Sequence, residues 1–253
     1  MWNRSVSVRP TWVPAFATWR PAICEDGEAR HVDDRNHLAA EFVRPVCDGA
    51  GQSGLFTMPS QSLKHWNERS ATALNWMEAA HHAVRGTGRG GRHATQQINQ
   101  SYLVLLSSHF QQFCRSLHSE AVNHLARNVD TALRPIMLAA LNVGRNLDQG
   151  NPNPGNLGAD FGRLGMRFWH DVTSFRRQDE MRKASLARMG HWRNAIAHQD
   201  FASATHVLEL GGRTEIRLQE VRAFRLACSW LALDFDAVVL AHIKAVAGPH
   251  AGW

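Results

Sequence analysis

The sequence predicts a mainly α-helical protein, a helical bundle with a small β-hairpin near residues 206–218. Three observations predict this fold. From about residue 62 onward, apolar residues recur at steps of three and four, which is the spacing of one buried helix face. Segments rich in Gly, Pro and Asn separate these periodic stretches and are typical of loops. The chain has 253 residues, of which 44% are apolar, so it can bury a core of its own.

The first 60 residues differ from the rest of the chain. They hold five of the nine prolines and show no sustained helical or strand period. We therefore expect an irregular N-terminal extension over 1–60 and an α-helical domain over 61–253. Met58 stands just before the first helical pattern, so translation could start at Met1 or at Met58.

Six helices are expected in the second region. The glycine-rich run 86–92 follows the first of them, matches no phosphate-binding loop, and is expected to be a flexible linker. Residues 207–210 and 214–218 alternate around Gly211-Gly212-Arg213, which is the pattern of a β-hairpin. The expected helices cover, approximately, residues 62–85, 95–127, 132–143, 157–169, 178–198 and 221–246.

Several tryptophans and other large apolar residues are placed by the same periodicity. Met181, in the helix expected over 178–198, should point inward. The tryptophans on apolar stripes should belong to the core rather than form platforms for stacked bases. These tryptophans are Trp66, Trp76, Trp169, Trp192 and Trp230.

The positive charge is concentrated in one part of the chain. The net charge is +6, and nearly all of the 28 cationic residues are arginine. Residues 163–201 carry eight Arg or Lys and four Asp or Glu, the densest positive stretch of the chain. This stretch suits an anionic partner such as RNA, although a solvated helix face would carry the same charges.

Metals, disulfides and membranes are not expected. The four cysteines form no C-x-x-C pair, and no carboxylate or cysteine joins His65, His81, His82 and His93 at ligand spacing, so we predict no metal site and no cofactor. No apolar run approaches the ~18 residues of a membrane span. The N-terminus lacks the apolar segment of a signal peptide. The protein is expected to be cytoplasmic.

The segment Arg193-Asn194-Ala195-Ile196-Ala197-His198 (RNAIAH) is the main candidate site. On an ideal helix Arg193 and His198 point about 140° apart, whereas Asn194 and His198 share a face. Either Arg193 points sideways to a phosphate, or the helix ends near His198 and all three side chains meet. Histidine can move a proton near neutral pH and arginine can hold a phosphate, so these groups could cleave RNA without a metal. By spacing alone an ordinary helix surface is favoured, because Arg30/His37 and Arg163/His170 have a similar spacing.

The residues around this segment resemble the HEPN superfamily, whose signature is R-x(4–6)-H with a polar residue after the arginine. Residues 101–110 and 161–169 are similar to the RiboL-PSP-like branch of that superfamily, and the resemblance is strongest over 95–245. Relatives often carry an acidic residue in the long first helix. This chain has Gln111 and Gln112 there, and Glu120 further along could substitute.

The resemblance implies a homodimer in which two motifs form one composite, metal-independent endoribonuclease site. Arg193, Asn194 and His198 would be the catalytic residues. Such domains act as toxins or antiphage defence effectors, so a cognate antitoxin protein is a possible partner. The alternative is a non-catalytic module of the same shape that binds RNA, a nucleotide or a protein. The residues expected to contact RNA are Arg182, Lys183, Arg188 and His191.

Overall fold

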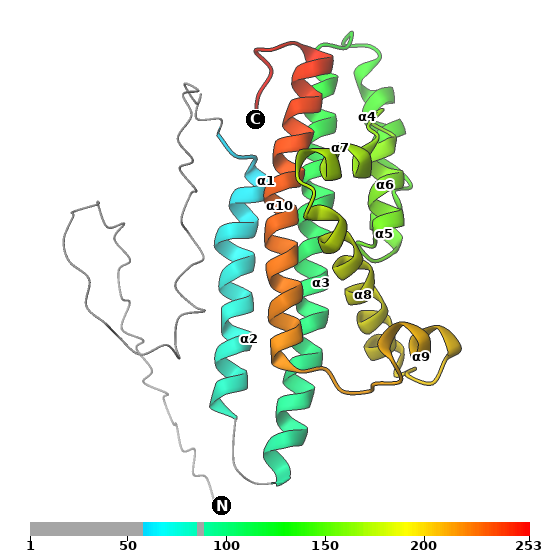
Figure 1. The fold of residues 1–253 in the computed structure, drawn as a ribbon. Coiled ribbons are helices and arrows are strands. Elements are labelled where there is room, and N and C mark those ends of the chain that lie inside the picture. The colour runs from blue at the N-terminus through cyan, green and yellow to red at the C-terminus, as the bar shows by residue number, and fades with distance from the viewer. Residues whose placement is uncertain (1–57, 85–88) are drawn as a thin grey trace, which may run out of the picture. The chain divides into compact units, whose positions relative to one another are not determined.

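The computed structural model describes residues 58–84 and 89–253, and this part of the chain is mainly helical, as the sequence predicts. Its long helices lie side by side (Figure 1). Within these residues no strand is formed. The elements are α1 (Gln61–His65), the π-helical η1 (Trp66–Ser70), α2 (Ala71–Ala83), α3 (Arg89–Ala126), α4 (Arg134–Asn142), α5 (Asn146–Gln149), α6 (Pro154–Gly162), α7 (Phe168–Phe175), α8 (Asp179–His198), α9 (Ala204–Leu210) and α10 (Leu218–Ala247).

One core joins the long helices. The helix α3 packs against α2, α8 and α10, and α8 also packs against α10. Aromatic rings fill the space between them. Phe168 stacks on Phe161 with 4.3 Å between ring centroids and meets Phe235 of α10 edge-on at 4.8 Å. The helix α8, which carries RNAIAH, is held in this core by its packing against α3 and α10.

The short helices α4 to α7 differ from the sequence prediction, which does not include α5. A single helix was expected over 157–169, but α6 and α7 are separate. Gly165 between them adopts φ +84°, a backbone conformation that favours glycine and that an α-helix does not allow. The helix α6 begins at Pro154, and the Asn153 side chain caps it by accepting from Asn156 N at 2.8 Å.

The predicted β-hairpin near 206–218 is wrong. Residues 204–210 form α9, capped by Ser203, whose Oγ accepts from His206 N. Gly211 and Gly212 both have positive φ and end this helix. The glycine pair that suggested a hairpin turn is instead a helix C-terminus, because a C-cap and a hairpin turn need the same left-handed conformation.

The helix α10 is both long and apolar. Its mean hydropathy reaches 1.6 over 18 residues, which is the length and composition of a membrane-spanning helix. The prediction that no apolar run approaches the length of a membrane span is therefore wrong. In the fold 61% of this window is buried, mainly against α3 and α8, as expected for a core helix.

Some predicted core residues are exposed. Met181 was predicted to point inward but is 75% exposed. Trp76 was predicted to belong to the core but is 69% exposed. Both predictions are wrong. Trp230 is 38% exposed, and the guanidinium groups of Arg176 and Arg182 lie over its ring. The predicted extension over 1–60 lies, apart from residues 58–60, outside the described residues.

Candidate functional site

The helix α8 carries the whole RNAIAH segment on its last turns. Arg193 and Asn194 are half-buried, and His198 is exposed. The opposite face of α8 is anchored in the core, so the motif stands on a rigid helix. The buried residues of this face include Leu186, Met189, Trp192, Ala195 and Ile196.

Asn194 is held by two donors. Its Oδ1 accepts from Asn151 Nδ2 at 2.5 Å and from Arg193 Nη1 at 3.4 Å. Asn151 is itself buried and lies in the loop between α5 and α6. The amide of Asn194 therefore links the Arg193 guanidinium to a fixed loop. In a single chain Asn194 contacts Arg193 and not His198.

His198 lies at the end of the helix. Gln199 adopts a left-handed conformation (φ 52°), and Asp200 N donates to Ala195 O at 3.0 Å, which closes the last turn. Within the described part of the chain, the His198 side chain has no hydrogen bond or ion pair. The helix ends at His198, but this end does not bring the three side chains together. Arg193 and Asn194 meet, while His198 stays apart in the solvent.

The loop that carries Asn151 is held from the long helix α3. Gln111 Nε2 donates to Leu147 O at 2.6 Å and to Gly150 O at 2.8 Å. Asn156 Nδ2 donates to Asn151 O at 2.8 Å. A side chain at position 150 would collide with Asn156, because a Cβ there would lie 2.8 Å from its Nδ2. The loop is therefore closely fitted beside the motif.

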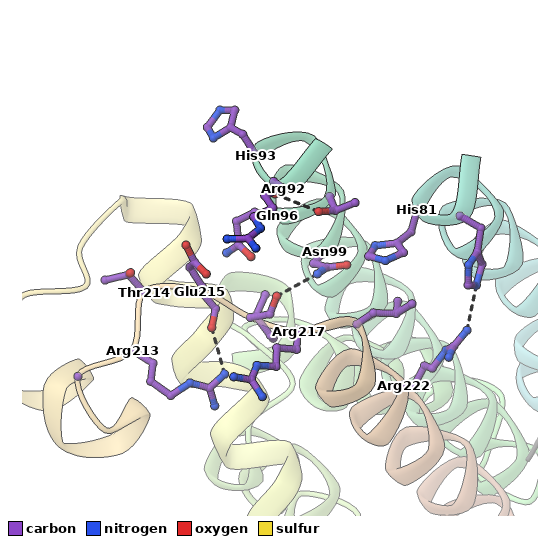
Figure 2. A pocket seen from close by; sticks show the side chains of 15 residues that line it. His81, Arg92, His93, Gln96, Asn99, Arg213, Thr214, Glu215, Arg217 and Arg222 are labelled. Carbon is purple, nitrogen blue, oxygen red and sulfur yellow. Dashed lines mark hydrogen bonds between the residues drawn. The ribbon is translucent and has the colours of Figure 1, made fainter. Parts of the chain in front are cut away.

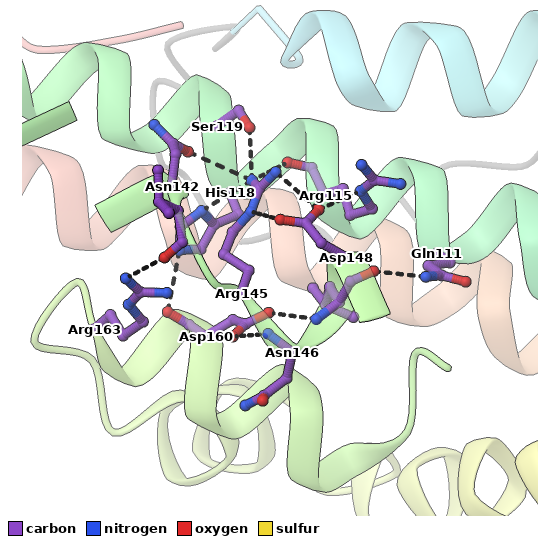
Figure 3. Close-up of polar contacts among 12 residues, drawn as sticks. Gln111, Arg115, His118, Ser119, Asn142, Arg145, Asn146, Asp148, Asp160 and Arg163 are labelled. Carbon is purple, nitrogen blue, oxygen red and sulfur yellow. Dashed lines mark hydrogen bonds and ion pairs between the residues drawn. The ribbon is translucent and has the colours of Figure 1, made fainter. Parts of the chain in front are cut away.

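A network around Arg145 supports the same loop (Figure 3). Asp160 accepts from the backbone N–H groups of Asn146 (2.9 Å) and Leu147 (2.8 Å), which fixes the start of α5. The Arg145 guanidinium donates to Asp148 (3.1 Å) and Ser119 (2.7 Å). Hydrogen bonds thus connect Asp160 through α5 and Gln111 to Asn151 and Asn194.

His118 in this network is not a proton carrier at neutral pH. Burial, together with the neighbouring Arg145, lowers the pKa of His118 to about 4. Its Nε2 lies 3.1 Å from Asp160 O, and its Nδ1 lies 3.5 Å from Arg145 Nη1. The neutral ring therefore accepts from Arg145 and donates to the carbonyl, a structural role.

The glutamines at the position of the expected acid differ from each other. Gln111 holds the loop beside the motif, and the exposed Gln112 donates to Ser116 at 3.0 Å. Glu120, considered as a substitute acid, accepts from Gln61 N (2.9 Å) and Ser62 N (3.1 Å) and so caps α1. Among the described residues, no carboxylate contacts Arg193, Asn194 or His198.

The four residues predicted to contact RNA differ in their exposure and in their ion-pair partners. Arg182 donates to Asp179 at 2.6 Å and to Asp234 at 3.1 Å, so its guanidinium is engaged in ion pairs within the fold. Burial, followed by the neighbouring Asp179, raises the pKa of Asp234 to about 6.

The other three lie closer to the solvent. Lys183 is 3.5 Å from Glu180, and His191 is 3.9 Å from Glu209. Arg188 is exposed and has no ion pair in the described part of the chain. Of the four, Arg188 is best placed to meet a phosphate.

Asn151 ties the motif to the rest of the fold, and the sequence does not predict this role. The run Asn151-Pro152-Asn153-Pro154 is typical of a loop and does not indicate which residue that loop contacts. Within residues 58–84 and 89–253, no group of three or more His, Cys, Asp or Glu is placed to hold a metal ion. No protein-family model, curated protein or solved structure matches the chain.

Proposed function

We propose that the chain is an endoribonuclease of HEPN type that acts as a homodimer without a metal ion. The observation that carries this proposal is the arrangement of RNAIAH on α8. Arg193 is oriented by Asn194, which the buried Asn151 holds, and His198 lies unpaired at the end of the same helix. An oriented arginine and a free imidazole on the same helix suit a phosphodiester substrate.

The proposed reaction uses the ribose 2′-OH as the nucleophile. His198 removes its proton while the 2′-oxygen attacks the adjacent phosphorus. The bond from phosphorus to the 5′-oxygen breaks, and that oxygen takes up a proton from a second acid. The products are a 2′,3′-cyclic phosphate and a 5′-hydroxyl end. Arg193 stabilises the charge that develops on the phosphoryl oxygens.

The second acid is the reason to propose a dimer. One chain offers one histidine at this site, and Gln111, where an acid was expected, is engaged with backbone carbonyls. A second copy of α8 would supply His198 of the other chain as the proton donor. Because His198 is exposed at a helix end, it can reach a facing copy without unfolding its own chain.

The test is cleavage of single-stranded RNA in the presence of EDTA. We expect wild-type protein to leave cyclic phosphate ends, and Arg193→Ala and His198→Ala each to lose at least about 100-fold in rate. Light scattering at tens of micromolar should report a dimer. The proposal fails if wild type and both variants are equally inert across varied RNAs.

The alternative is a non-catalytic helical module that binds RNA, a nucleotide or a protein. One observation favours it, namely that no carboxylate contacts the RNAIAH side chains in the described part of the chain. Under this alternative His198→Ala would leave the biological effect intact, and the purified protein would bind RNA without cutting it. The endoribonuclease proposal includes a toxin or defence role, a cognate antitoxin and a cytoplasmic location. These further proposals depend on it.

A further inference from the structure

The helix α4 is apolar on nearly every side, yet the fold does not bury it. Of its nine residues only Arg134 and Asn142 are polar, and none of the nine is buried. Its main contact is with α3, and it lies at the edge of the bundle (Figure 1). A helix that is apolar all round is normally buried. The outward side of α4 therefore lacks the cover that its composition calls for.

The outward face of α4 exposes large apolar side chains at helical spacing. Leu133, Ile136 and Val143 are 57%, 67% and 71% exposed and stand three and seven positions apart. Ala139 and Ala140 lie between them and are exposed as well. Contiguous exposed apolar surface of this kind marks interaction sites.

An apolar groove continues this face. It lies among the end of α3, α4, the turn after α6 and the end of α10, and its volume is about 480 Å³. Asn128 and Arg163 are the polar residues of its lining, and the other lining residues are apolar. They include Val246, which is 63% exposed. The groove can therefore receive apolar side chains of a partner beside the exposed face of α4.

A second hollow in the molecule has a different character. It lies among the end of α2, the first turns of α3 and the segment 212–218 (Figure 2). Its lining is mostly polar or charged and includes the exposed Arg92 and Arg217. Of the two, the groove beside α4 is the one whose lining resembles the apolar centre of a protein interface.

The charges around the α4 groove are positive and lack acidic partners. Arg134 Nη2 donates to Arg127 O at 3.1 Å, where α3 ends, and Arg163 Nη2 donates to Val143 O at 2.9 Å, where α4 ends. One guanidinium is thus held near each end of α4, and neither has an ion pair among the described residues. Asp130, the one acidic residue of segment 125–143, accepts from the backbone N–H two positions on at 2.8 Å. An acidic partner would supply the carboxylates that the fold does not.

We propose that α4 and this groove bind an amphipathic helix of a partner protein that carries acidic residues beside its apolar stripe. The apolar side chains of that helix cover Ile136 and Val143 and enter the groove, as in other helix-in-groove complexes. Its carboxylates meet the guanidinium groups of Arg134 and Arg163. The hollow shape favours the side chains of a helix over a lipid surface. The proposal does not depend on RNA cleavage, because no RNAIAH residue lines the groove.

Selection from a displayed peptide library on the full chain tests the proposal. The library holds helices of about 18 residues with Leu, Ile, Met or Phe along one stripe and Glu or Lys at the polar positions. We expect the recovered peptides to carry more Glu than Lys and to bind with Kd at or below about 10 µM by fluorescence anisotropy. Scrambling the apolar positions should weaken them at least about tenfold. Recovery of no helix, or of basic helices, would overturn the proposal.

Variants locate the binding site. Ile136→Glu/Val143→Glu places two carboxylates on the exposed face and should weaken the recovered peptide at least about tenfold. The matched control Met181→Glu/Leu208→Glu adds the same charge at side chains that are 75% and 79% exposed and lie outside the groove. The control should stay within about threefold of wild type. Because all four side chains are exposed, both double variants should melt near the wild-type temperature. Equal weakening in both would overturn the site.

The same double variant distinguishes other occupants of this face. We expect wild type and Ile136→Glu/Val143→Glu to have the same oligomeric state by light scattering. We also expect neither to sediment with vesicles of phosphatidylcholine and phosphatidylglycerol. Loss of a dimer in the variant would show that the face joins two copies of the chain. Vesicle binding by wild type alone would show that it binds anionic lipid. Either result would overturn the proposal.

Discussion

Two groups of arginines in this bundle differ in what their guanidinium groups contact. Arg145 is buried and donates to Asp148, Ser119 and the carbonyl of Arg115. Arg92 and Arg217 are exposed and have no ion pair within the described residues. The amino-acid composition does not distinguish these arginines from one another. Their partners decide whether an arginine stabilises the fold or is available to a ligand.

The motif arginine lies between these two extremes. Arg193 is half-buried and donates one hydrogen bond, to Asn194 Oδ1 at 3.4 Å. It is therefore oriented by the fold but keeps most of its donors. A catalytic phosphate contact needs this combination, because a fully engaged arginine cannot bind substrate and an unheld one is poorly positioned.

The largest expected effect is on the buried arginine. Arg145→Ala should lower the free energy of unfolding by about 3 kcal/mol, because it removes the hydrogen bonds that the buried guanidinium donates to Asp148, Ser119 and the carbonyl of Arg115. Urea denaturation measures this change. The control Arg217→Ala should stay within about 0.5 kcal/mol. Similar losses for the two variants would break the comparison between the two groups.

The next effect is the pH dependence that His118 creates. The pKa of His118 is about 4 in the fold, against 6.5 for an ordinary histidine. His118 is therefore protonated near pH 6.5 in the unfolded chain but only near pH 4 in the folded chain. This stabilisation is complete above pH 6.5, and about 3 kcal/mol of it is lost as the pH falls to 4.

A variant isolates this contribution from the carboxylates. The pKa values of Asp234 and Asp236 are raised to about 6 by burial, so these groups act in the opposite sense as the pH falls through 6. Unfolding of wild type and His118→Gln should be compared at pH 7 and at pH 4. The free energy of unfolding of wild type, relative to that of the variant, should be lower at pH 4 than at pH 7. A constant difference would mean that folding leaves the pKa of His118 at its ordinary value.

A smaller effect is expected at the two adjacent glutamines of α3, Gln111 and Gln112. Gln111→Ala removes two hydrogen bonds to the loop that carries Asn151, so it should cost about 1–2 kcal/mol of stability and slow RNA cleavage. Gln112→Ala removes only a surface contact with Ser116 and should change neither property. Equal behaviour of the two variants would show that the loop does not position Asn194.

The helices of the bundle could be predicted because their signals are local. The stripes of α3, α8 and α10 follow the 3.6-residue period, and the predicted ends lie within a few residues of the observed ones at most termini. The hairpin prediction failed because Gly211-Gly212 fits a helix end as well as a turn. The separation of α6 from α7 was missed because it depends on one backbone angle, at Gly165.

The site could be predicted only in part. Arg193, Asn194 and His198 were recognisable as a motif on one helix. That Asn194 contacts Arg193 was not, since this contact depends on Asn151, more than forty positions away in the sequence. Arg182 was expected to meet RNA, but its partner Asp234 lies in α10 and could not be identified from spacing alone. Long-range partners decide the role of each charge.

One measurement tests the central claim most directly, namely that RNAIAH cleaves RNA through the ribose 2′-OH. The substrate is a DNA strand with a single internal ribonucleotide, incubated with wild type, His198→Ala or His170→Ala in EDTA. His170 is an exposed histidine of the Arg163/His170 pair and serves as the matched control. We expect wild type and His170→Ala to cut at the ribonucleotide and leave a 2′,3′-cyclic phosphate, and His198→Ala to leave the strand intact. Equal cutting by His198→Ala, or no cutting by wild type, would contradict the claim.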